Sequence, residues 1–171
     1  MIALDLDGTI VDYSPAGHAT RANHAVLRDL AARRVPAVAI CTNQGGLPFG
    51  VLGKLRKDGQ PYPTPAQFVA RLSVIRLAME DYGIVSPQVR VSLYHPYADP
   101  AAIDAAARQV RSGLDVMAGL NWTVYTTAAA RKPGTLMLRS VCATEYWGDS
   151  DEDAQAAQAA GIPFVRVPRF G

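Results

Sequence analysis

The chain has 171 residues, of which 49% are hydrophobic and 19% charged, and its formal net charge is +2. This length predicts one domain, residues 1–171, and the near-neutral charge gives no strong electrostatic footprint for nucleic acid. No apolar run is long enough to cross a bilayer, and no basic stretch leads into an apolar segment after Met1. We therefore expect a cytoplasmic protein with no membrane partner.

Extended and helical patterns alternate along the chain, which predicts an α/β fold with a doubly wound, Rossmann-like parallel sheet and helices on both faces. Because Pro163 opens the last strand, that strand is expected near an edge of the sheet. Residues 121–126 are expected to form a short strand or an extended loop. Five strands are expected at 2–6, 36–41, 88–94, 144–148 and 163–167, with helices near 22–33, 65–82 and 151–160 and another after Asp99.

Two aspartates separated by one leucine end the first predicted strand. A strand alternates its faces, so Asp5 and Asp7 are expected to point the same way from its carboxyl end. Like charges in one site resist ionising together, and a bound cation or a shared proton reduces that penalty. A polar turn after a strand is the alternative interpretation, because Asp-Gly is a common turn sequence.

The second predicted strand ends in Thr42-Asn43-Gln44-Gly45-Gly46. In a parallel sheet the carboxyl ends of neighbouring strands face one crevice, so Thr42 is expected beside Asp5 and Asp7. Its hydroxyl and the following amides can donate to an anionic oxygen, although a simple turn would use the same residue types. The stretch 45–64, rich in glycine and proline, is expected to form a long loop that faces the substrate.

The segment Arg131-Lys132-Pro133 carries two cations. Pro133 suits the first position of a helix, which would put Lys132 at the amino end, where the helix dipole favours anions. A phosphate or carboxylate in front of Lys132 would resolve this mismatch. Arg131 could add a bidentate contact to the same ligand, or it could be a solvated surface residue.

The last polar segment is Gly148-Asp149-Ser150, followed by three acidic residues. Ser150 and Asp153 have the spacing of a capping box, which explains part of the acidity. Capping does not explain Asp149, which lies outside the predicted helix. A hard divalent cation such as Mg²⁺, which prefers oxygen ligands, does explain it.

These four segments, in this order, resemble the motifs of the haloacid dehalogenase (HAD) superfamily of phosphotransferases, and the resemblance covers the whole chain. The matching residues are Asp5, Asp7, Gly8 and Thr9 in the first motif, Thr42 in the second, Lys132 in the third, and Gly148, Asp149 and Asp153 in the fourth.

The resemblance implies a phosphatase in which Asp5 attacks phosphorus to form an aspartyl-phosphate. Asp7 would act first as general acid and then as general base. Mg²⁺ is the implied cofactor, held by Asp5, the backbone carbonyl of Asp7 and Asp149. Asp153 would support this metal site from behind or pair with Lys132.

The same resemblance implies how the phosphoryl group is bound. Thr42 and the amide of Asn43 would contact its oxygens, with Lys132 neutralising charge on Asp5 and the phosphoryl group. A receiver-like phosphoacceptor switch domain is an alternative, but such domains place their acidic residues on different strands.

The short first gap between motifs implies a capless or minimally capped enzyme with an open site. The motifs around Thr42 and Lys132 look like the branch that holds polynucleotide 3′-phosphatases, histidinol-phosphatases and heptose-bisphosphate phosphatases. The last two commonly carry a Cys/His zinc loop, whereas no cysteine lies between Cys41 and Cys142. A polynucleotide 3′-phosphate end is therefore the favoured substrate, and a histidinol-, sugar- or nucleotide-phosphate is the alternative. His95 could contact substrate or pack within a loop.

Overall fold

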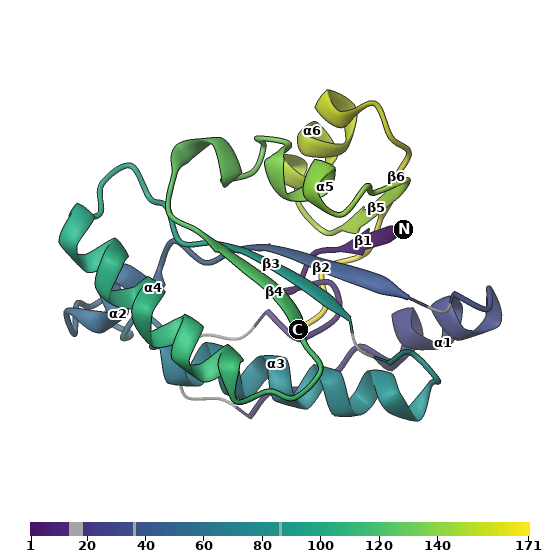
Figure 1. Ribbon diagram of the computed structural model, residues 1–171, viewed down its shortest axis with the longest axis horizontal. Coiled ribbons are helices and arrows are strands. Elements are labelled where there is room, and N and C mark those ends of the chain that lie inside the picture. Colours follow the sequence, from purple (N-terminus) through teal and green to yellow (C-terminus); the bar gives the residue numbers. More distant parts are fainter. Residues whose placement is uncertain (14–18, 36, 86) are drawn as a thin grey trace.

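Among the residues that the structure describes, six parallel strands form one sheet in the order β4-β3-β2-β1-β5-β6. The computed structural model describes residues 1–13, 19–35, 37–85 and 87–171 (Figure 1). The α/β, Rossmann-like prediction is confirmed, but the number of strands is six and not five. The strands are β1 (Ile2–Leu4), β2 (Val38–Asn43), β3 (Gln88–Ser92), β4 (Asn121–Tyr125), β5 (Glu145–Gly148) and β6 (Phe164–Arg166).

The additional strand is β4, in the segment for which the sequence predicts either a short strand or an extended loop. It pairs with β3 along its whole length, from Gln88 with Asn121 to Ser92 with Tyr125. Val124 is the one buried residue of β4, so the strand lacks the apolar run by which the inner strands are recognised. The opposite edge is β6, as Pro163 predicts. Pro36, where the sequence analysis began the second strand, lies outside the described residues.

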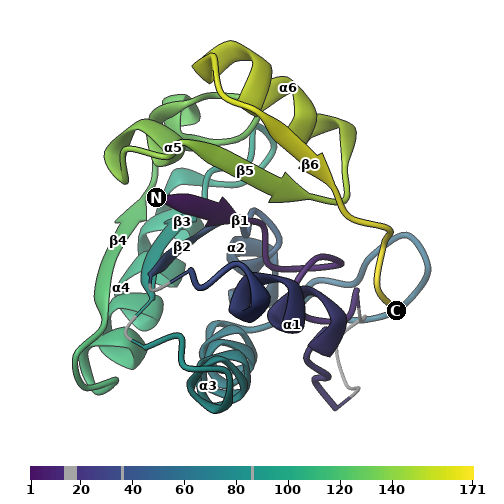
Figure 2. The same cartoon turned by 90° about the vertical axis from the view of Figure 1, so that its right-hand side faces the viewer.

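The two faces of the sheet are covered by different helices (Figures 1 and 2). Leu4 and Leu6 belong to a core that packs against α1 (His24–Ala32), α3 (Pro65–Asp81) and α4 (Pro100–Asp115). Ala3, with the opposite orientation, belongs to a smaller core under α5 (Leu136–Ser140) and α6 (Asp151–Ala160). Asp5 has the same parity as Ala3, so its side chain is directed toward the α5 and α6 side.

Local sequence signals explain where the main helices begin. Thr64 and Gln67 form a capping box at the start of α3, and Ser150 and Asp153 form the predicted one at the start of α6. Asp99 accepts a hydrogen bond from the backbone of Ala101 at the start of α4. The apolar stripes of α3 and α4 are buried, as their spacing predicts.

The stretch 45–64 is more regular than predicted. It contains the short helix α2 (Leu47–Val51) and an antiparallel bridge between Leu55 and Pro61. A side chain on Gly50 could not be accommodated, because its Cβ would overlap the carbonyl oxygen of Pro63. Close backbone packing, which sequence periodicity does not report, therefore orders this segment.

Candidate active site

Asp5 lies at the carboxyl end of the central strand β1, and its side chain is buried. Its backbone N–H donates to the carbonyl of Trp147, which continues the pairing of β1 with β5. The chain then turns at Gly8, whose φ of +82° favours glycine. A Cβ at Gly8 would lie 2.6 Å from a carboxylate oxygen of Asp149, so this glycine also lets Asp149 approach the loop.

Lys132 is the centre of a buried polar cluster. Its Nζ donates to Asp5 Oδ1 at 2.6 Å, to Asp153 Oδ1 at 2.7 Å and to the Tyr146 hydroxyl at 2.8 Å. The Tyr146 hydroxyl in turn donates to Asp153 Oδ1 at 2.8 Å. All four side chains are buried, so the three protons of the ammonium group are satisfied without water.

The charges in this cluster do not balance, because one ammonium faces two carboxylates. Burial raises the pKa of Asp5 to about 7. The ammonium group of Lys132 lowers it, but this group is shared between Asp5 and Asp153 and offsets only part of the effect of burial. Burial also opposes the charged form of Asp153, but Lys132, Ser150 and Tyr146 together hold its pKa below the usual value. Burial alone would lower the pKa of Lys132, yet Asp5 and Asp153 raise it. The cluster thus keeps Lys132 and Asp153 ionised and leaves Asp5 in need of a further cation.

Asp149 completes an acidic group with Asp5 and Asp153, in which one carboxylate oxygen from each lies within 4.8 Å of the others. The Thr9 hydroxyl lies 3.5 Å from Asp5 Oδ2 and 3.4 Å from Asp149 Oδ1. Both oxygens of Asp153 are already engaged, by Lys132 and Tyr146 on one side and by Ser150 on the other. The carboxylates of Asp5 and Asp149 supply hard oxygen donors that fit Mg²⁺, although Asp149 Oδ2 is paired with Arg169, and Asp153 fits the supporting role.

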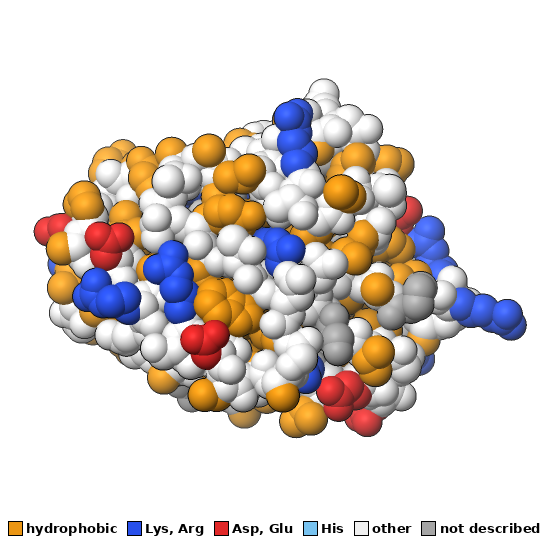
Figure 3. All heavy atoms as spheres, in the orientation of Figure 1, with side chains coloured by type: hydrophobic (Ala, Val, Ile, Leu, Met, Phe, Trp, Pro, Cys, Tyr) orange, Lys and Arg blue, Asp and Glu red, His pale blue; other side chains and the backbone are white. Residues whose placement is uncertain are grey.

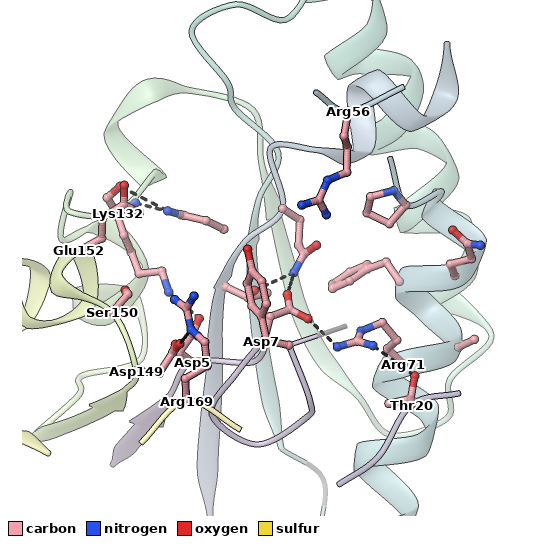
Figure 4. A pocket seen from close by; sticks show the side chains of 18 of the residues that line it. Asp5, Asp7, Thr20, Arg56, Arg71, Lys132, Asp149, Ser150, Glu152 and Arg169 are labelled. Atoms are coloured by element: carbon pink, nitrogen blue, oxygen red, sulfur yellow. Dashed lines mark hydrogen bonds and ion pairs between the residues drawn. The ribbon is translucent and has the colours of Figure 1, made fainter. Parts of the chain in front are cut away.

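The Asp7 carboxylate points away from this acidic group. It accepts hydrogen bonds from Gln44 Nε2 at 2.6 Å and from Arg71 Nη2 at 2.8 Å. Figure 4 shows Asp7 in the middle of the cavity, with Asp5 and Asp149 on one side and Arg71 and Thr20 on the other. The structure therefore brings Asp7 to the cavity as predicted, but its side chain supplies no oxygen to the metal group.

The residues after β2 are arranged around Lys132. Thr42 is buried and accepts a hydrogen bond from Gln44 Nε2 at 2.9 Å. The side chain of Asn43 binds the backbone of Lys132 in both directions, with its Oδ1 2.9 Å from the amide nitrogen and its Nδ2 3.3 Å from the carbonyl oxygen. Thr42, Asn43 and Lys132 all line the cavity, as predicted.

The local structure predicted for Lys132 is wrong. The helix that follows it, α5, begins at Leu136 and not at Pro133. Lys132 lies in the turn between this helix and the short 3₁₀ helix η1 (Ala128–Ala130). Here the N–H of Gly134 donates to the carbonyl of Arg131, which closes the turn before the helix starts. The ammonium group of Lys132 is instead satisfied by Asp5, Asp153 and Tyr146.

Arg131 and His95 lie apart from the cavity. Arg131 Nη1 donates to the carbonyl of Tyr94 at 3.1 Å, and the residue does not line the cavity in this structure. The His95 ring packs against Phe49 and Tyr97, with ring centroids 5.0 and 5.6 Å away. Burial lowers the pKa of His95, with a further contribution from Arg131. The placement of His95 agrees with loop packing, one of its two interpretations.

The cavity has a volume of about 590 Å³, large enough for a small organic ligand. Some of its lining residues were not anticipated from the sequence. Arg71 lies on the face of α3 that also buries Phe68, and Arg56 comes from the segment after α2. Arg169 follows β6. Gln44 and Arg56 lie in segments that the sequence analysis expected at the site, whereas the unanticipated lining residues include Tyr13, Thr20, Phe68, Arg71 and Arg169.

One signal for Arg71 was present in the sequence. It follows Phe68 by three positions and precedes Ile75 by four, so it belongs to the apolar stripe of α3. An arginine within a buried stripe needs a partner. Here the partners are Asp7, the carbonyl of Asp12 and the Thr20 hydroxyl.

Comparisons of the chain with protein-family models, curated proteins and solved structures found no match. The function must therefore be argued from the site itself. In the described part of the chain, no helix has the length and apolar character that crossing a membrane requires.

Proposed function

We propose that this chain is a Mg²⁺-dependent phosphomonoester hydrolase that acts through an aspartyl-phosphate on Asp5. The observation that carries the proposal is the surplus negative charge at the end of β1. Asp5 and Asp149 have carboxylate oxygens within 4.8 Å of each other, and Lys132, 2.6 Å from Asp5, is shared with Asp153. Such a group favours a divalent cation and a dianionic ligand that bridges it to the lysine.

Asp5 is the residue best placed to act as nucleophile. Lys132 occupies its Oδ1, and its Oδ2 lies at a longer distance of 3.5 Å from the Thr9 hydroxyl. In the first step Oδ2 forms a bond to phosphorus as the bond from phosphorus to the leaving oxygen breaks. When bound by Asp5 and Asp149, Mg²⁺ would supply positive charge that screens the phosphoryl oxygens from the attacking carboxylate.

Asp7 is placed to handle the proton. It projects into the cavity from the same loop as Asp5, and Gln44 and Arg71 fix its orientation. It gives a proton to the leaving oxygen in the first step. In the second step it takes a proton from the water that attacks phosphorus, which releases inorganic phosphate and regenerates the Asp5 carboxylate. Thr42 donates to the phosphoryl oxygens in both steps, and Lys132, whose three protons stay engaged, neutralises charge on Asp5 and the phosphoryl group.

The leaving group would occupy the part of the cavity formed by Phe68, Arg71 and Arg56. A polynucleotide 3′-phosphate end is the first substrate class that we propose, with small phosphorylated metabolites as the alternative. On the face drawn in Figure 3, the coloured Lys and Arg side chains are dispersed among acidic, hydrophobic and uncharged ones. A long nucleic acid would therefore bind through local contacts at its end and not through a broad basic band on that face.

A phosphate-release screen tests the proposal. The purified chain is incubated with Mg²⁺ and with 3′-phosphorylated oligonucleotides, histidinol phosphate, sugar phosphates and nucleotides. Release should require Mg²⁺, be abolished by EDTA and be lost in Asp5→Asn. If no phosphomonoester is hydrolysed but Asp5 becomes stably phosphorylated by a small phosphodonor, the site belongs to a phosphoacceptor switch. If neither occurs, the proposed reaction is wrong.

A further inference from the structure

The segment after β6 crosses the loop that carries Asp7 and Gly8. The N–H of Phe170 donates to the carbonyl of Gly8 at 2.9 Å, and the N–H of Tyr13 donates to the carbonyl of Phe170 at 2.7 Å. Both backbone hydrogen bonds are made by Phe170, so they fix the segment in which the preceding residue, Arg169, lies beside the acidic group (Figure 4).

Arg169 pairs with the proposed metal ligand Asp149. Its Nε lies 2.6 Å from Asp149 Oδ2. The two partners differ greatly in burial, since the Asp149 side chain is 3% exposed and that of Arg169 is 51% exposed. A buried carboxylate without a cation is costly, whereas a half-exposed guanidinium can leave its partner for water at little cost. Asp149 therefore depends on the pair more than Arg169 does.

A second contact, with Tyr13, holds Arg169 at the cavity independently of its ion pair with Asp149. Its guanidinium carbon lies 4.4 Å from the centroid of the Tyr13 ring, and both side chains line the cavity. Tyr13 follows the same loop as Gly8, so the aromatic ring and the backbone contacts of Phe170 hold Arg169 from two sides. This cation–π contact does not involve Asp149.

We propose that Arg169 exchanges partners during the reaction cycle. In the metal-free protein it is the counter-ion of Asp149. When a divalent cation binds Asp149, Arg169 is released and binds the anionic oxygens of the substrate at the same mouth of the cavity. The guanidinium is always charged and presents several donors, which suits it to a phosphate group once the carboxylate is taken. This inference rests on the proposed function, because it requires that Asp149 binds the cation.

The exchange predicts that removing Arg169 changes two affinities in opposite directions. Arg169→Gln should bind Mn²⁺ about three- to fivefold more tightly than the wild type when no phosphate is present, because the competing ion pair is lost. The same variant should bind inorganic phosphate about tenfold more weakly at saturating Mg²⁺, because a charge-assisted contact is lost. Both affinities are measured by isothermal titration calorimetry and do not require turnover.

Two further variants test the alternatives. Arg169→Lys should give intermediate values for both affinities, because it keeps the charge and loses the planar fork. Arg28→Gln, which removes the same charge from an exposed position on α1, should change neither affinity. A variant of Arg169 that weakens both affinities, or that leaves either unchanged, would show that the residue only holds the loop and would overturn the exchange.

The outcome for Asp149→Asn separates this inference from the proposed function. If Asp149→Asn loses Mn²⁺ binding while Arg169→Gln keeps the wild-type affinities for Mn²⁺ and phosphate, the metal site is supported and the exchange is refuted. Unchanged Mn²⁺ binding in Asp149→Asn would refute the metal site and, with it, the exchange.

Discussion

Replacing Lys132 by Met tests the buried charge cluster directly. Methionine has a similar length but no charge, so the substitution leaves Asp5 and Asp153 buried without the ammonium group that lies 2.6 and 2.7 Å from them. Breaking a buried ion pair by removing one partner costs about 3–5 kcal/mol. We expect the free energy of unfolding to fall by about this amount at pH 8, because without Lys132 Asp5 and Asp153 must either stay ionised and repel each other or take up a proton.

The cost should depend on pH. With Lys132 present the pKa of Asp5 is already raised to about 7, and loss of Lys132, which lowers it, raises it further. At pH 5 Asp5 is therefore protonated in the variant, which removes the repulsion within the pair. The loss in Lys132→Met should therefore be smaller at pH 5 than at pH 8. Equilibrium unfolding in guanidinium chloride with EDTA present, at both pH values, measures this difference.

Matched variants identify the origin of the effect. Lys57→Met, at an exposed position, should change the unfolding free energy by less than about 0.5 kcal/mol. The double variant Lys132→Met with Asp153→Asn should recover part of the loss, because it removes one of the unpaired carboxylates. A loss below about 1 kcal/mol in Lys132→Met at pH 8, or an equal loss in Lys57→Met, would refute the cluster as described.

Three further predictions follow from the same site. Asp5 has a folded-state pKa of about 7 against an ordinary value of 3.8, so its contribution to stability is present below pH 3.8 and is lost as pH rises through 7. In EDTA, the unfolding free energy of Asp5→Asn relative to wild type should therefore rise by up to about 4 kcal/mol between pH 4 and pH 8, and parallel pH profiles would contradict this. Asp7→Asn should slow phosphate release by about 10²-fold or more while Mn²⁺ affinity stays near the wild-type value, and near-normal turnover would remove Asp7 from the mechanism. Gly8→Ala should lower the unfolding free energy by about 1–3 kcal/mol and weaken Mn²⁺ binding, because φ is +82° and the new Cβ would press on Asp149; unchanged metal affinity would show that the loop relaxes freely.

The site-forming segments could be predicted from the sequence because strand ends are local features. Asp5 and Thr42 follow apolar runs, and parallel pairing of β1 with β2 then brings them to one edge of the sheet. Asp149 could be predicted as a site residue because helix capping explains the role of Asp153 but gives Asp149 none. These inferences needed only chain order and the alternation of strands.

Other features depend on contacts between distant segments and leave no local pattern. Tyr146 reads as an ordinary strand residue, yet its hydroxyl lies 2.8 Å from both Lys132 and Asp153. Arg169 meets Asp149 only because the segment after β6 turns back across the first loop. The helix predicted to begin at Pro133 was wrong for a related reason. Proline favours the first position of a helix, but the turn that brings Lys132 to Asp5 delays the start of α5 to Leu136.

The double hydrogen bond between the Asn43 side chain and the backbone of Lys132 ties together two parts of the chain that are 89 residues apart. The pair resembles the paired backbone hydrogen bonds of a β-ladder. It therefore holds the loop after β2 and the turn that contains Lys132 in a fixed relation in the ligand-free protein. Donors that are held in place beforehand do not need to reorganise when charge develops on a phosphoryl group. Under the proposed function, this fixed pair of loops would hold the phosphoryl group, and the segments around the rest of the cavity would select the leaving group.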